Sequence, residues 1–233
     1  MDPLSEAIAD YLSGTAARLI VHSDLADDDE MDVSYYFRSE NDLPEIEKKA
    51  LGYVSGKILD VGAAVGAHSI PLMNKGFDVL AIDTCPIAVD YLIGKKVHAK
   101  KINFFDFEDI KFDTLLFLMN GIGIAESIDK LDLFLQHCRK LLNTGGIVIL
   151  DTTDVKYFYE DDEGGFWIDL NAKYYGEFKY QFSYGEHKGD WFNWLYIDPS
   201  TLEEYAIKNK FSFEILFENE VASHYLIKLT KQS

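Results

Sequence analysis

The stretch ILDVGAAVGAHS, residues 58–69, carries the pattern that decides the fold. Its apolar start ends in an acid, Asp60, and gives way to a loop built around Gly62, Ala64 and Gly66. Glycine permits tight turning and lets another group approach the backbone closely. A buried strand that finishes on a carboxylate beside such small residues therefore predicts a small, partly cationic ligand lying against this loop.

Strand and helix patterns alternate on both sides of this loop. Apolar runs predict strands at 57–62, 77–83, 101–106, 112–120 and 145–154, and helical spacing predicts helices at 67–76, 86–96 and 128–142. Apolar strands that alternate with helices of this length indicate an α/β fold, in which a parallel sheet is covered by helices on both faces.

The C-terminal end follows a different pattern. A helix is predicted at 201–210, and two strands at 211–219 and 223–231 are separated by a short turn. Strands so close in sequence must pair antiparallel, because a parallel return needs a crossover of about a dozen residues. The sheet is therefore expected to finish with one reversed strand.

The N-terminal part is expected to be helical. Residues 3–21 have helical spacing, and 42–54 predicts a second helix. The acidic run 24–32 is typical of a solvated linker, since its acids match no cation-binding loop. We expect residues 1–56 to form an N-terminal helical cap segment that precedes a main domain at 57–233.

An aromatic insert interrupts this domain at residues 155–198. Of the 40 residues from 157 to 196, 15 are aromatic. Aromatic residues alternate in 177–184 and again in 192–196, which predicts a β-hairpin with each set on one face. We favour a lid over an acceptor site, with packing against the sheet or a second subunit as the alternative, and Trp167 shares this ambiguity.

Composition narrows the classes of partner. The 233 residues carry 40 acids against 22 bases, a formal charge of −18, which repels nucleic acids and anionic membranes. Cys85 and Cys138 are far apart and form no metal-binding or redox pair, so no metal is expected. With no signal peptide or membrane-spanning run predicted, we expect a cytoplasmic protein.

Acids are predicted to end three successive strands. Asp83 lies 21 residues beyond Gly62, the distance at which an acid accepts hydrogen bonds from ribose hydroxyls. Asp106 is placed to accept from an adenine amino group while the ring packs on Phe107. Asp60 is placed to hold an ammonium group. Because ligands of open parallel sheets bind beyond the carboxyl ends of the strands, these acids are expected to converge.

Glycine spacing separates two classes of cofactor. A dinucleotide fingerprint here needs glycines at 62, 64 and 67, whereas the chain has Gly62, Ala64 and Ala67. A carboxylate at Asp60 also suits a pyrophosphate badly. An NAD(P)-dependent oxidoreductase therefore remains an alternative, and a non-catalytic, cofactor-binding interaction module is another.

With these residues in place, the span 57–154 resembles the class I S-adenosylmethionine-dependent methyltransferases. Asp60, Gly62, Ala64 and Gly66 match their first motif, except that Ala64 replaces the middle glycine. The resemblance implies a Rossmann-like, seven-stranded sheet in the order 3-2-1-4-5-7-6, with the last strand antiparallel. The segment 119–124 and the aromatic insert resemble one bacterial subgroup of this family.

The resemblance also implies the cofactor, S-adenosyl-L-methionine, and a set of residues around it. We expect the cofactor to be bound by Arg38, Asp60, Gly62, Ala64, Gly66, His68, Asp83, Thr84, Asp106, Phe107, Asn120 and Gly121. Of these, Asn120 and Gly121 are placed by topology to border the methyl group. Arg38 either meets the cofactor carboxylate or the substrate, or makes a surface ion pair.

The expected activity is methyl transfer to a small-molecule acceptor. The strand-four end is not the Asp/Asn-Pro-Pro-aromatic form found in amino-group nucleic-acid methyltransferases. Alignment accounts for much of the acceleration, so a general base is needed only where the acceptor must lose a proton. Asp151, Asp154, His68 and His187 are candidates, and the sequence assigns the role to none of them.

Overall fold

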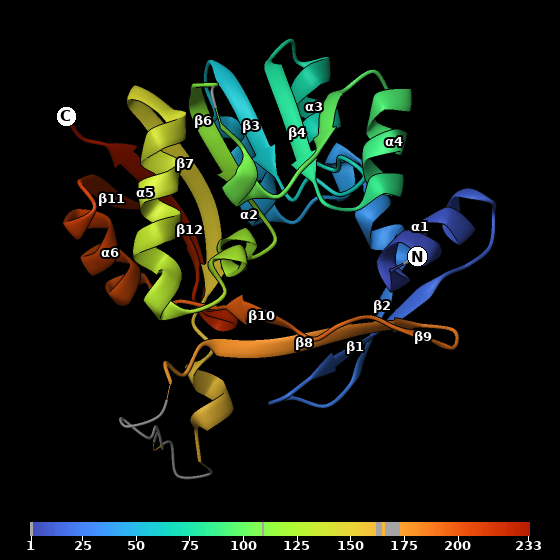
Figure 1. Cartoon of the computed structure of the whole chain (residues 1–233). Coiled ribbons are helices and arrows are strands. Elements are labelled where there is room, and N and C mark those ends of the chain that lie inside the picture. The colour runs from blue at the N-terminus through green and yellow to red at the C-terminus, as the bar shows by residue number, and fades with distance from the viewer. Residues whose placement is uncertain (1, 109, 162–164, 166–172) are drawn as a thin grey trace.

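The computed structural model describes residues 2–108, 110–161, 165 and 173–233. Two sheets organise these residues, a large one of seven strands and a smaller one of five. Figure 1 shows the smaller sheet running across one end of the larger one, on the side where the parallel strands finish. Among the residues covered, no helix has the length and apolar composition needed to cross a membrane.

The large sheet has the predicted topology. Its strands are β3 (Lys57–Val61), β4 (Asp78–Asp83), β5 (His98–Lys101), β6 (Phe112–Phe117), β7 (Leu142–Thr153), β11 (Phe211–Asn219) and β12 (His224–Lys231). Their spatial order is β11-β12-β7-β6-β3-β4-β5, which is the expected order 3-2-1-4-5-7-6 read from the other edge. Strand β12 runs antiparallel to both neighbours, so the predicted reversal is confirmed.

Helices cover both faces of this sheet. They are α2 (Glu45–Tyr53), α3 (Ser69–Asn74) and α4 (Pro86–Gly94) on one face, and α5 (Leu131–Leu141) and α6 (Pro199–Lys208) on the other. Adjacent residues of a strand pack into hydrophobic cores on opposite faces of the sheet: Leu59 lies in the core under α5, and Ile58 lies in the core under α2. This alternation, with both faces apolar, explains why the strands appear as continuous hydrophobic runs.

The smaller sheet contains the predicted hairpin. Strands β8 (Glu177–Tyr184) and β10 (Phe192–Leu195) pair antiparallel, and β9 (His187–Lys188) also pairs with β8. The hairpin prediction is therefore confirmed. Trp167, whose role the sequence left open, lies outside the described residues.

The N-terminal region corrects two expectations. The helix predicted over 3–21 ends early, because α1 covers Pro3–Leu12 and Gly14 takes a φ of +95°, a conformation that stops a helix. Strand β1 (Arg18–Ser23) follows and pairs with β8. The predicted linker 24–32 is also partly wrong, since its last residues form β2 (Asp29–Asp32) beside β1. The N-terminal segment thus completes the sheet that the aromatic hairpin begins.

The third parallel strand is the other correction. The strand predicted at 101–106 is shifted, because β5 ends at Lys101 and residues 104–106 form a 3₁₀ turn, η3 (Phe104–Asp106). Asn103 explains the turn, since its side chain accepts the backbone N–H of Phe105 and so competes with strand pairing. Asp106 consequently belongs to a turn and does not end a strand.

Candidate cofactor and acceptor site

The loop after β3 is folded tightly over the end of β4. The backbone N–H groups of Gly62 and Ala63 both donate to the carbonyl of Ile82, at 2.9 and 3.1 Å. Gly62 has a φ of +71°, and nothing lies within 4 Å of where its side chain would be. Gly66 is required for a different reason, because a Cβ there would come within 2.5 Å of Leu92 on α4. The loop thus presents open backbone on one side and packs closely on the other.

Asp83 is fixed against this loop. Its carboxylate accepts backbone N–H bonds from Ala64 and from Cys85, both at 2.8 Å. Burial raises the pKa of the Asp83 carboxyl, although these hydrogen bonds act to lower it. Thr84, which follows it, is exposed. Tyr36 was missed by sequence reasoning, and its pKa is raised by burial and then by the nearby charge of Asp83.

Asp60 is a buried carboxylate at the end of β3. It is 2% exposed and accepts a 2.5 Å hydrogen bond from the hydroxyl of Ser69, at the start of α3. Burial raises its pKa, and the charge of Asp83 adds to this effect while His68 opposes it. The acid of β4 therefore lies close enough to affect the ionisation of the acid of β3. Ser69 is a second residue that the sequence did not single out.

Arg38 and His68 meet at a buried acid, Glu47 on α2. A nitrogen of each bonds to the same oxygen, Oε2 of Glu47, at 2.7 Å. Burial alone raises the pKa of Glu47, but the hydrogen bond and charge of His68, together with Arg38, lower it overall. The side chain of Arg38 is 6% exposed, and its Nε is a buried donor that has no hydrogen-bond partner among the residues that the structure describes. This orphaned N–H is a donor available to a ligand.

The turn after β6 is strained and anchored. Met119 and Asn120 have φ values of +61° and +55°, a left-handed conformation that is unusual for residues with side chains. Asp151 on β7 accepts the backbone N–H of Asn120 at 3.0 Å. The hydroxyl of Thr153 donates to the side-chain oxygen of Asn120 at 2.9 Å. Gly121 opens the following 3₁₀ turn, η4 (Gly121–Ala125), and is buried. Strain held in place by such contacts is common at functional sites.

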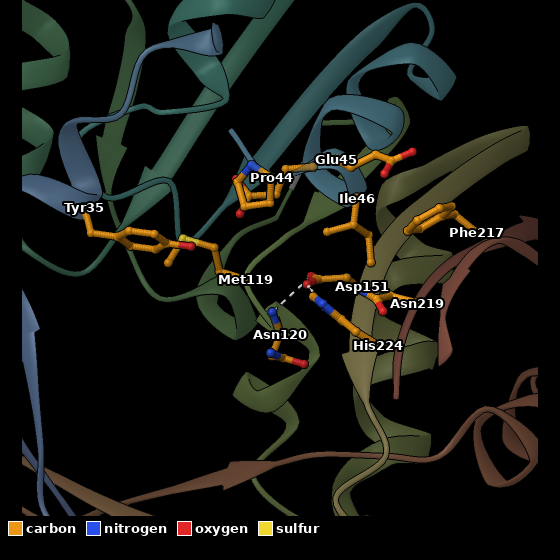
Figure 2. A pocket seen from close by; sticks show the side chains of 11 residues that line it. Tyr35, Pro44, Glu45, Ile46, Met119, Asn120, Asp151, Phe217, Asn219 and His224 are labelled. Carbon is orange, nitrogen blue, oxygen red and sulfur yellow. Dashed lines mark hydrogen bonds and ion pairs between the residues drawn. The ribbon is translucent and has the colours of Figure 1, made fainter. Parts of the chain in front are cut away.

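A cavity of about 350 Å³ opens beside this turn. Figure 2 shows its lining, which comes from the start of α2, from the ends of β6, β7 and β11, from the start of β12 and from Tyr35 on the 3₁₀ turn η1 (Val33–Phe37). Within it, Nε2 of His224 lies 2.6 Å from Oδ2 of Asp151. His224 was not among the expected bases. Only the register of β12 against β7 could have revealed it, since 73 residues separate the pair.

Several predicted residues lie elsewhere. Asp106 is exposed in η3, and no recorded hydrogen bond joins it to the Gly62 loop within the described ranges. Phe107 is 1% exposed and packs against Phe112 in the core, so its ring offers no free face for adenine. Of the candidate bases, His187 pairs with Glu6 at the far hairpin, and Asp154 accepts the hydroxyl of Tyr175.

Comparisons with known proteins agree with this geometry. A family model described as a methyltransferase domain matches residues 37–207. A S-adenosylmethionine-dependent methyltransferase from Bacteroides fragilis, solved in complex with S-adenosyl-L-homocysteine, is 39% identical, covers 100% of this chain and 95% of its own, and superposes with a TM-score of 0.92.

More distant structures show the fold alone. The CcbJ methyltransferase from Streptomyces caelestis is 13% identical, with coverage of 84% of this chain and 93% of its own and a TM-score of 0.63. The sugar N-methyltransferase KedS8 from a Streptoalloteichus species is also 13% identical, with coverage of 81% and 85% and a TM-score of 0.56. No curated protein matches the sequence.

The strand order, the family model and the Bacteroides relative all decide against a nicotinamide-dependent oxidoreductase. They identify S-adenosylmethionine as the cofactor. The chain belongs to the class I S-adenosylmethionine-dependent methyltransferases.

Proposed function

We propose that this enzyme transfers the methyl group of S-adenosylmethionine to a small molecule bound in the cavity beside Asn120. The observation that carries the proposal is the cavity itself, which opens where β6 and β7 end and has a volume of about 350 Å³. Pockets for small ligands have volumes of roughly 300–1,000 Å³. The surplus of negative charge, −18 overall, supports an acceptor other than a nucleic acid.

The residues of the loop fit the cofactor group by group. Asp83 is held where it can accept hydrogen bonds from paired ribose hydroxyls, and Gly62 leaves open backbone beside it. The unpaired Nε–H of Arg38 suits the cofactor carboxylate, and the buried acid Asp60 suits its ammonium group, directly or through Ser69. The ring of Phe107 lies in the core and takes no part in this fit.

The cofactor, when bound, supplies an electrophilic methyl group on a sulfonium. The protein's own contribution is to orient the acceptor and exclude water, and alignment of this kind can lower a barrier by about 7–11 kcal/mol. The turn of Met119 and Asn120 is suited to this task, because hydrogen bonds from β7 hold it in one conformation.

In this proposal the aromatic insert supports the turn beside the cavity and does not cover the cavity. No described residue of the span 155–198 lines the cavity, so the geometry gives little support to a lid over it. Instead, Trp194 on β10 packs on Gly123 in η4 so closely that a Cβ there would meet its ring at 2.0 Å. We propose that the hairpin holds in place the turn of Asn120 and η4, which borders the methyl group.

Two free, buried cysteines also fit the reducing cytoplasm expected for this enzyme.

Cofactor binding and methyl transfer give the direct test. S-Adenosylhomocysteine binding is measured by calorimetry for the wild type and for Asp83→Ala, which removes the ribose acceptor. We expect affinity to fall about 10-fold or more. Ser23→Ala, a change on the distant strand β1, is the matched control. Unchanged affinity in Asp83→Ala would place the cofactor elsewhere, and absence of methyl transfer across a broad acceptor screen would favour a non-catalytic binding module.

A further inference from the structure

The Asp151–His224 pair has the geometry of a carboxylate that orients an imidazole. Asp151 is 1% exposed, whereas the His224 side chain is 23% exposed and lines the cavity. The acid is thus sealed inside and the imidazole is accessible. Figure 2 shows Asp151 lying between Asn120 and His224, with one carboxylate oxygen on each.

This hydrogen bond determines which nitrogen of His224 carries hydrogen. A carboxylate can only accept, so the 2.6 Å contact to Oδ2 requires a hydrogen on Nε2. In neutral imidazole the other nitrogen, Nδ1, then holds a lone pair. Over the ranges that the structure covers, Nδ1 makes no recorded hydrogen bond. Among the described residues, His224 therefore keeps an unoccupied proton acceptor, Nδ1, on a ring that lines the cavity, and Asp151 stabilises the imidazolium that forms when a proton arrives.

The charges around the cavity indicate the kind of molecule that brings this proton. Three carboxylates line it, those of Glu45, Glu47 and Asp151, and no lysine or arginine is among the described lining residues. Two have cationic partners behind the lining, since Glu45 pairs with Lys49 at 3.3 Å and Glu47 with Arg38 at 2.7 Å. Among the described residues, the carboxylate of Asp151 has no lysine or arginine partner and bonds only to the backbone N–H of Asn120 and to Nε2 of His224.

We propose that His224 is the general base for an amine acceptor, which enters as an ammonium ion and loses a proton to Nδ1 of His224. Asp151 is the positioning residue. The inference rests on the proposed function and names its substrate class. An anionic acceptor is disfavoured by the same carboxylates. The rings of Tyr35 and Phe217 also line the cavity; Arg38 lies over one ring and Lys49 over the other, and the remaining ring surface gives the organic part of an amine an apolar contact.

The step balances without any further reagent. The N–H bond of the ammonium breaks, its electron pair stays on nitrogen as the lone pair, and the proton bonds to Nδ1. The neutral amine then forms its N–C bond with the methyl carbon, while the electrons of the broken S–C bond remain on sulfur. The product leaves as a methylated ammonium ion, and His224 returns its proton to solvent.

Binding of a simple probe tests the substrate class. The protein saturated with S-adenosylhomocysteine is titrated with phenethylamine and, separately, with its near-isosteric alcohol, 2-phenylethanol. We expect the amine to bind at least about 10-fold more tightly. We also expect the C2 proton signal of His224, identified by its loss in His224→Gln, to shift when the amine binds. Equal or tighter binding of the alcohol, or no saturable binding of the amine below about 10 mM, overturns the proposal.

Variants test the base itself. Gln at 224 can still donate to Asp151 but offers no basic nitrogen, so His224→Gln preserves the contact and removes the chemistry. We expect methyl transfer to phenethylamine to fall about 100-fold or more. His187→Gln, at an exposed hairpin remote from the cavity, is the matched control. Wild-type rates matched by His224→Gln, or binding without turnover in the wild type at any pH, contradict the assignment.

The pH profile separates a base from a structural residue. In the wild type, kcat/KM should rise with pH until His224 loses its proton, and His224→Gln should lose this limb and follow the ionisation of free amine instead. The other titratable groups facing His224 are Asp151 on β7, Glu45 and Glu47 on α2, and Tyr35 on η1. Asp151→Asn should lower kcat/KM throughout this limb, because the imidazolium loses its stabilising charge. An unchanged limb in both variants counts against the dyad.

Cofactor binding distinguishes the two levels of failure. If S-adenosylhomocysteine binds the wild type and His224→Gln equally but the amine tests fail, the base assignment is wrong and the methyltransferase function stands. If the wild type does not bind S-adenosylhomocysteine, the proposed function itself fails.

Discussion

The backbone N–H of Ala64 donates to Oδ2 of Asp83 at 2.8 Å while Ala64 itself holds a φ of +44°. The hydrogen bond joins the loop after β3 to the end of β4. The residue that donates this hydrogen bond is strained, because the methyl group of Ala64 disfavours a left-handed backbone conformation by roughly 1–2 kcal/mol. Sequence comparison with the family motif already marks this position, where Ala64 replaces a glycine.

Replacement of Ala64 by glycine should relieve this strain. We expect Ala64→Gly to raise the free energy of unfolding by about 0.5–1 kcal/mol, because the relief exceeds the added entropy of the unfolded chain. Chemical denaturation measures the change. Ala88→Gly, in the first turn of α4, is the control and should be destabilising. A loss of stability in Ala64→Gly would mean that the loop is not strained.

Arg38→Lys should discriminate between two ligands. Lysine keeps the positive charge but lacks the Nε–H that is unpaired in the structure. We expect weaker binding of S-adenosylhomocysteine, by about 10-fold, and unchanged binding of methylthioadenosine, which has no carboxylate. Calorimetry with both ligands is the measurement. An equal loss for both would point to a general disturbance of the Arg38–Glu47–His68 cluster instead.

Asp60 gives a prediction about pH. Burial raises its pKa, so the ionised group weakens folding, and this loss appears as the pH rises above the unfolded value of about 4. Asp60→Asn should therefore be more stable than the wild type at pH 7, and the difference should shrink toward pH 4. Asn can still accept from Ser69, so the hydrogen bond is retained. Denaturation at the two pH values measures the effect, and cofactor binding should weaken at the same time.

The pKa of Asp198 is shifted in the opposite direction to that of Asp60. Burial alone raises its pKa, but hydrogen bonds from Ser200, Thr201 and Tyr174 outweigh this and lower it to about 2. Its stabilisation is therefore present above pH 4 and is lost as the pH falls toward 2. Asp198 also caps α6, accepting the N–H of Thr201 at 2.9 Å. We expect Asp198→Ala to cost about 1–2 kcal/mol at pH 7 and much less at pH 2, as measured by thermal or urea unfolding. An equal cost at both pH values would assign it to packing.

The sequence predicts most of the large sheet because most of its strands have a local signal, which the exposed strand β5 lacks. The apolar runs of β3, β4 and β6 are bounded by turn residues, and the short turn between β11 and β12 forces them to pair antiparallel. The predicted strand ends are wrong where a side chain competes with strand pairing, as Asn103 does after β5.

The smaller sheet and the dyad depend on contacts that no local pattern reveals. Strand β1 pairs with β8, and His22 bonds to Ser183 across 161 residues. Asp151 is one of the four candidate bases in the sequence, but its partner His224, which begins the reversed strand, is not among them. Only the register between β7 and β12 brings them together. The acids of the cofactor loop were predictable because the alternating pattern itself places parallel strand ends at one edge.

A double-mutant cycle tests whether the aromatic hairpin supports the active-site turn. A Cβ at Gly123 would lie 2.0 Å from Cε2 of Trp194, so Gly123→Ala should be destabilising by about 1–3 kcal/mol through overpacking. Trp194→Ala should be destabilising as well, because it leaves a void beside η4. The double variant should lose less unfolding free energy than the sum of the losses in the two single variants, since the new methyl group fills part of that void. Strict additivity in unfolding free energies would show that the two residues are not in contact. We further expect Trp194→Ala to reduce methyl transfer more than it reduces binding of S-adenosylhomocysteine, because the turn it supports borders the acceptor cavity and not the ribose site.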